Sequence, residues 1–267
     1  MKREQILSAM LLTGLGSLAH GQILVSSHTY YAVANIIDTN GGVLASNSDS
    51  GSLLSGGSVA TSITGTRSDY GVTTEHFGES ALTAAASGGG ISGSGSAHSR
   101  TTYVSGGNSF IGQATDSGFG QTVRFMVGSS GLYKANLEGI ITTFHHSYEP
   151  DGPAGSFFYI FRLYSPVSGY LFNSEVQNSS TLANVPFTQT LTLTTGVEYE
   201  LTYVGACNGR TVNYASQQAG SGAFGETAFE GSFSLQPVPE PTTIGMVGMG
   251  LAAAARRRKA RKNEQTA

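Results

Sequence analysis

The chain has 267 residues, of which 37 are glycine, 12 % are charged and none is tryptophan. This composition disfavours a helical enzyme core and favours strands joined by glycine- and serine-rich turns. Eight of the 14 basic and three of the 17 acidic residues lie at the two ends, so residues 22–238 keep six bases and 14 acids, a net charge of −8. Such a body repels nucleic-acid phosphates, which excludes nucleic acid as a partner.

The first 21 residues have the pattern of a secretory signal peptide. Lys2 and Arg3 precede an apolar run over residues 6–18, and small residues then permit cleavage after Ala19 or after Gly21. The run is too short for an ordinary membrane-spanning helix. We therefore expect an N-terminal signal helix over residues 1–21 and export through the secretion translocon.

Residues 22–236 are expected to form one all-β body, an antiparallel β-sandwich of jelly-roll-like type. Alternation of apolar and polar residues with period two dominates this region, and turn residues separate the alternating segments. Residues 157–163 are apolar on both faces for much of their length, which indicates a covered strand. The segments with the clearest alternation are 123–127, 133–141, 157–163, 188–194, 197–203 and 228–235.

The two halves of this body differ in amino-acid composition. Residues 22–120 are rich in glycine, serine and alanine, as in "NSDSGSLLSGGS" (47–58) and "LTAAASGGGISGSGSAHSR" (82–100), whereas residues 121–236 are more apolar. A flexible linker is one interpretation of these stretches. We favour strands, because a sandwich needs more strands than the second half provides.

Motifs for nucleophilic or cofactor chemistry are weak. Cys207 is the sole cysteine, which rules out an intrachain disulfide, and its neighbours predict a small buried side chain. Residues 220–225, "GSGAFG", have the spacing of a dinucleotide fingerprint, but strand-like residues follow where a helix is required. The chain contains no Gly-x-Ser-x-Gly elbow and no evident carboxylate pair, so we expect no enzyme.

Metal binding has only fragmentary support. Two adjacent histidines in a strand point to opposite faces, and isolated acids do not supply the six to eight oxygens of a calcium site. We expect no resident cofactor, with a loosely held calcium ion as the alternative. The residues concerned are His145, His146, Glu149 and Asp151 for a metal, and Asp38 and Asp116 for calcium; Asn178 opens a glycosylation sequon.

Tyrosine is abundant, with 12 copies in the chain. Core packing is the default role of these side chains, but exposed tyrosines can stack on sugar rings. Four candidates for that role are Tyr30, Tyr31, Tyr148 and Tyr170.

The C-terminal end combines a short proline-rich segment, an apolar run over residues 242–255 and a basic cluster. A helix of 14 residues covers about 21 Å, against a hydrocarbon core of about 30 Å, so this short hydrophobic transmembrane helix is a weak anchor. Its strongly apolar residues are Ile244, Val247 and Leu251, and the cluster that holds its end in the cytoplasm is Arg256, Arg257, Arg258 and Lys259.

The order of these parts, beginning with "VPEP" at 238–241, resembles the PEP-CTERM sorting signal. The resemblance covers residues 237–262 and leaves 263–267 as a tail. It implies transient recognition by exosortase, a membrane-embedded enzyme of Gram-negative bacteria that make exopolysaccharide. Pro239, Glu240 and Pro241 would be the recognition residues and Arg256 to Lys259 the stop cluster. The chain would then be tethered transiently in the inner membrane before passing to the cell surface or matrix.

The sequence therefore predicts an exported, non-enzymatic surface or matrix protein with a structural or adhesive role among exopolysaccharides. One alternative is a carbohydrate-binding module for matrix polysaccharide. A second alternative, an extracellular hydrolase, has less support.

Overall fold

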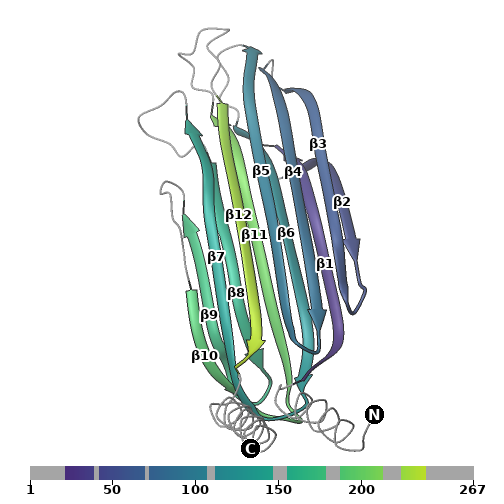
Figure 1. Ribbon diagram of the computed structural model, residues 1–267. Coiled ribbons are helices and arrows are strands. Elements are labelled where there is room, and N and C mark those ends of the chain that lie inside the picture. Colours follow the sequence, from purple (N-terminus) through teal and green to yellow (C-terminus); the bar gives the residue numbers. More distant parts are fainter. Residues whose placement is uncertain are drawn as a thin grey trace, which may run out of the picture.

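The computed structural model describes residues 22–38, 42–69, 72–106, 112–146, 155–178, 187–212 and 224–238. Within them the chain forms two antiparallel sheets of six strands, packed face to face along the length of an elongated sandwich (Figure 1). Sheet A has the order β2 (Val43–Gly51), β1 (Ile23–Ile37), β6 (Gly112–Val127), β11 (Glu198–Val212), β8 (Gly155–Ser165) and β9 (Gly169–Asn178). Sheet B has the order β10 (Phe187–Leu193), β7 (Gly131–His146), β12 (Phe224–Pro237), β5 (Gly90–Gly106), β4 (Val72–Ser87) and β3 (Gly56–Asp69).

The antiparallel sandwich predicted from the sequence is confirmed, and both sheets draw strands from both halves of the chain. Residues 82–100 form most of the β4–β5 hairpin, and residues 47–58 supply the end of β2 and the start of β3. The linker interpretation of these two stretches is therefore wrong. Serine and glycine are tolerated in the strands because every second side chain faces the outside of the sandwich.

Aromatic rings fill the interior where β8 and β11 cross over β12. The Phe161 ring is fully buried, with centroid distances of 4.8 Å to Phe172 and 5.5 Å to Phe233. The Tyr203 ring lies 4.7 Å from that of Phe233. Tilted ring pairs at these distances add to the free energy gained by burying their area.

A row of three glycines crosses sheet B, and one of them makes room for a further aromatic ring. Gly95 of β5 pairs with Gly231 of β12, which pairs with Gly139 of β7. A Cβ atom on Gly95 would lie 2.5 Å from Cε2 of Phe119, a ring that sheet A contributes. The absence of a side chain at Gly95 therefore lets the Phe119 ring approach the backbone of the opposite sheet.

Side chains from β2 cover the open edge of β3. Asn47 donates from Nδ2 to the carbonyl oxygen of Ser62 at 2.8 Å, and Asp49 Oδ2 accepts from the backbone N–H of Ala60 at 3.1 Å. An edge strand of 14 residues otherwise offers free backbone groups to another chain. These two bonds join the sheets at one side and blunt that edge.

The two ends of the described body lie at the same end of the sandwich (Figure 1). The backbone N–H of Ile23 donates to Gly88 O in the β4–β5 turn at 3.1 Å, and that of Val238 donates to Leu132 O at 2.8 Å. Leu235 pairs with Ile91, just after the same turn. The segments before residue 22 and after residue 238 therefore leave from neighbouring places.

Among the described residues there is no helix long and apolar enough to cross a membrane. The predicted signal helix and the predicted C-terminal hydrophobic helix lie outside those residues.

Candidate functional site

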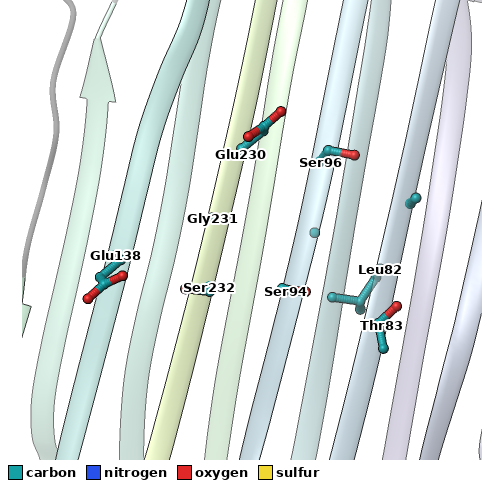
Figure 2. Close-up of a pocket in the computed structure, with 10 residues that line it drawn as sticks. Leu82, Thr83, Ser94, Ser96, Glu138, Glu230, Gly231 and Ser232 are labelled. Atoms are coloured by element: carbon teal, nitrogen blue, oxygen red, sulfur yellow. The ribbon is translucent and has the colours of Figure 1, made fainter.

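The outer face of sheet B carries an open trough of about 510 Å³ (Figure 2). Thr83, Ser94, Ser232 and Glu138 form one row across β4, β5, β12 and β7, because each is the register partner of the next. Glu230 lies one row away, in register with Ser96. Figure 2 shows the two carboxylates on separate strands, with the serine side chains beside them.

This trough offers hydroxyl groups that donate and accept hydrogen bonds, with two carboxylates that only accept. Its lining contains no aromatic side chain, so it lacks a platform for stacking. The trough therefore suits polar, solvated contacts.

The outer face of sheet A carries a different hollow, a groove of about 380 Å³ that we call the glycine groove. Its floor is formed by Gly118 of β6 and Ala206 of β11, which are register partners. Tyr31 of β1 lines one side and Phe158 of β8 the other. A Cβ atom on Gly120 would lie 2.8 Å from Tyr31 Oη, so the tyrosine ring lies across that glycine.

A polar pair closes one end of the glycine groove. Asp116 of β6 and Asn208 of β11 are register partners, and the Asn208 amide donates to Asp116 Oδ1. Burial raises the pKa of the Asp116 carboxyl, while the bond from Asn208 acts in the opposite direction. The groove therefore contains the Tyr31 ring, a floor without large side chains and a carboxyl group that is hydrogen-bonded to Asn208.

A third cluster is buried between the sheets and has a structural role. His76 of β4 is hydrogen-bonded to Thr74 at 2.8 Å through Nε2 and to Thr115 of β6 at 3.0 Å through Nδ1. The Thr101 hydroxyl lies 2.9 Å from that of Thr115 and also donates to Gly209 O at 2.7 Å. These bonds link four strands of both sheets, which makes the network part of the core.

Burial lowers the pKa of His76, and nearby Arg67 acts in the same direction, whereas a bond to Gln113 opposes them. Burial also lowers the pKa of His28. Both imidazoles are therefore neutral in the fold at neutral pH. In the unfolded chain they take up protons as the pH falls through about 6.5.

We expect acid to destabilise the fold through these histidines. Below pH 6.5 these histidines bind protons in the unfolded state but not in the folded state. The free energy of unfolding therefore falls as the pH falls, by up to about 1.4 kcal/mol per pH unit for each histidine. Denaturant titrations at pH 7.5, 6 and 5 should show a shallower fall for His76→Gln than for the wild type. Asp116 acts in the opposite sense, because a raised carboxyl pKa favours the folded state in acid.

The matched control is His98→Gln, which changes a partly exposed histidine on the outer face of β5. It shows how far the replacement of a surface histidine changes the pH dependence, and the His76→Gln result is compared with it. If the free energy of unfolding of His76→Gln falls with pH as steeply as that of the wild type, the buried histidine is not the cause.

The predicted site residues have mixed outcomes. Tyr31 and Tyr170 are exposed, at 41 % and 56 %, as expected. Tyr30 was expected to be exposed but is only 4 % exposed, because its ring turns inward and fits against Gly51 and Gly57; that prediction is wrong. Tyr148 lies outside the described residues.

Cys207 is a buried thiol, as predicted, and burial raises its pKa to about 12. The residues that follow the "GSGAFG" stretch form β12, which confirms the strand expected there. Asp38 Oδ1 accepts from the backbone N–H of Gly42 at 2.7 Å, so this carboxylate already has a backbone donor. Within the described residues no three metal-ligating side chains cluster, and calcium binding stays a prediction.

Several predicted residues cannot be placed. His145 and His146 lie in β7, and Asn178 ends β9, but nothing further is described of their side chains. The following residues lie outside the described part of the chain: Ala19, Gly21, Glu149, Asp151, Pro239, Glu240, Pro241, Ile244, Val247, Leu251, Arg256, Arg257, Arg258 and Lys259.

Sequence reasoning missed the glycine groove. A local signal was present, because Gly118 and Gly120 flank Phe119 and must face the opposite side of the strand from that apolar residue. Tyr31 and Asn208 join the groove only through strand pairing, which the local sequence does not reveal.

These features define the class: an all-β sandwich with a buried polar network and two outer-face hollows. The end of the chain specifies it further, because residues 237–259 match the family model of the PEP-CTERM protein-sorting motif. The protein therefore carries a PEP-CTERM sorting signal, as predicted. That motif indicates a secreted protein that is anchored transiently in the membrane before export, and it implies processing by exosortase.

No curated protein sequence matches the chain. Among solved structures, TmCBM61 in complex with β-1,4-galactotriose is 11 % identical, with 48 % of this chain and 71 % of that chain covered and a TM-score of 0.25. The VP2 subviral particle of infectious bursal disease virus is 8 % identical, with 90 % and 74 % covered and a TM-score of 0.20. At these TM-scores neither structure informs the fold or the function of this chain.

Proposed function

We propose that the protein is an exported, non-enzymatic component of the cell surface or the exopolysaccharide matrix, where its sandwich has a structural or adhesive role. The observation that carries the proposal is the sorting motif at residues 237–259. The covered edge of β3 supports it, because a protein that accumulates outside the cell must resist unwanted edge-to-edge pairing.

The state of the nucleophilic and basic side chains supports the non-enzymatic part of the proposal. The Cys207 thiol is buried, and a pKa of about 12 keeps it protonated at neutral pH. His76 is occupied by the interior network and is also buried. Incubating the full chain with polysaccharide from the producing strain should release no new reducing ends; sustained release would favour the hydrolase alternative.

Fractionation of the producing strain tests the location. We expect the processed protein in the surface or matrix fraction, and we expect a deletion strain to form a matrix that disperses more readily under shear. Recovery of the protein only inside the cell, or a deletion strain with an unaltered matrix, would contradict the structural role.

Carbohydrate binding is the second candidate function. It is favoured by the exposed ring of Tyr31 in the same groove as the Asp116–Asn208 pair, because sugars present apolar ring faces together with hydroxyl groups. Affinity electrophoresis of the full chain through matrix polysaccharide tests it. Retardation supports a binding module, whereas unchanged mobility leaves the structural role alone.

A further inference from the structure

We propose that the glycine groove on the outer face of sheet A binds a neutral polysaccharide chain, with Tyr31 under one sugar ring and Asp116–Asn208 bonded to hydroxyl groups of another ring of the same chain. This inference rests on the carbohydrate-binding candidate and assigns that function to one site. The trough on sheet B lacks an aromatic platform and is not assigned to this role.

The first argument is the position of the Tyr31 ring. Its inner face is covered by the backbone of Gly120, so the ring is held along the sheet, while 41 % of the residue stays exposed. A flat ring that is fixed on one side and open on the other is a platform for the apolar face of a pyranose. A tyrosine loses little conformational entropy on binding, because it has few rotatable bonds.

The second argument is the shape of the floor. Gly118 has no side chain, and Ala206 beside it has only a methyl group, so a ligand can approach the backbone of β6 and β11. A Cβ atom on Gly118 would lie 3.0 Å from that of Ala206, so the floor has no space for a larger pair. The volume of about 380 Å³ lies within the range of small-molecule sites.

The third argument is the polar end. Tyr31 is in register with Gly120, and Asp116 lies four residues earlier on β6, about 13 Å along the strand. A single pyranose ring is shorter than that distance. The ligand is therefore a chain of at least two sugar units, with hydroxyl groups donating to the Asp116 carboxylate.

Charge selects among polysaccharides. Asp116 is an acid at the site, and residues 22–238 carry a net charge of −8. A uronic-acid polymer would be repelled by both, whereas a neutral hexose polymer would not. The site therefore favours neutral chains over anionic ones.

The experiment uses affinity electrophoresis of the full chain through gels of hydroxyethylcellulose, galactan, mannan or dextran, with polygalacturonate as the anionic comparison. We expect retardation by at least one neutral polymer and none by polygalacturonate. Tyr31→Ala and Ala206→Leu should each weaken the interaction about tenfold, the first by removing the platform and the second by filling the floor.

The matched control is Tyr164→Ala, which removes another exposed tyrosine from the outer face of sheet A, on β8 and outside the lining of the glycine groove. It should retain wild-type binding, and thermal unfolding should show that all three variants are folded. If Tyr31→Ala and Ala206→Leu are retarded as strongly as the wild type, the glycine groove is not the binding site. The protein then binds carbohydrate at another site. If no neutral polymer retards the wild type, both the groove assignment and the carbohydrate-binding candidate fail.

Discussion

Replacing Phe161 by alanine should lower the free energy of unfolding by about 3–5 kcal/mol, the usual cost of deleting a buried phenyl ring. Phe161 is fully buried, and its ring lies within 6 Å of those of Phe172, Phe187 and Phe233. Removing the phenyl ring would leave a cavity in the core between the two sheets, to which strands of both sheets contribute side chains. A domain of ordinary stability has about 5–15 kcal/mol in total, so this one change removes a large part of it.

Tyr164→Ala is the control for this prediction, because Tyr164 lies on the same strand but faces outward and is 39 % exposed. Urea titrations followed by circular dichroism should give a small change for this variant, of about 0.5–1 kcal/mol. Equal losses for the two variants would mean that the aromatic cluster is not the main source of stability at this strand.

The sequence predicts the strands well, because their signal is local. Residues 157–163 alternate clearly and lie in β8, and residues 197–203 alternate as clearly and lie in β11 from Glu198 onward. The serine- and glycine-rich hairpin of β4 and β5 was harder to predict, because small residues alternate without a strong difference in hydropathy. The need for more strands, and not the local pattern, identified it.

The sequence did not predict which of two adjacent tyrosines faces the core. Tyr30 and Tyr31 must point to opposite sides of β1, but both residue types suit either side. The choice depends on glycines of other strands: Gly51 and Gly57 accept the ring of Tyr30, and Gly120 lies under that of Tyr31. Gly120 lies 89 positions from Tyr31 along the chain, so only the assembled sheet brings them together.

Replacing Glu240 by alanine should block maturation, leaving a full-length chain in the membrane fraction of the producing strain. Glu240 lies between Pro239 and Pro241 inside the matched motif, where a processing enzyme would recognise it. Cleavage after Val238 would spare the sandwich, because β12 ends at Pro237 and the backbone N–H of Val238 still donates to Leu132 O. Removal of the tail therefore leaves β12 and its pairing with β5 and β7 intact.

Glu264→Ala is the matched control, because it removes an acid from the same tail but outside residues 237–259. The wild type and this control should be released, and isoelectric focusing should show the change that processing makes: the full chain carries −3, whereas residues 22–238 alone carry −8. Deleting the exosortase should reproduce the Glu240→Ala result in the wild-type protein. Normal release of Glu240→Ala would show that the glutamate is not needed for recognition, whereas normal release without the exosortase would show that another route exports the sandwich.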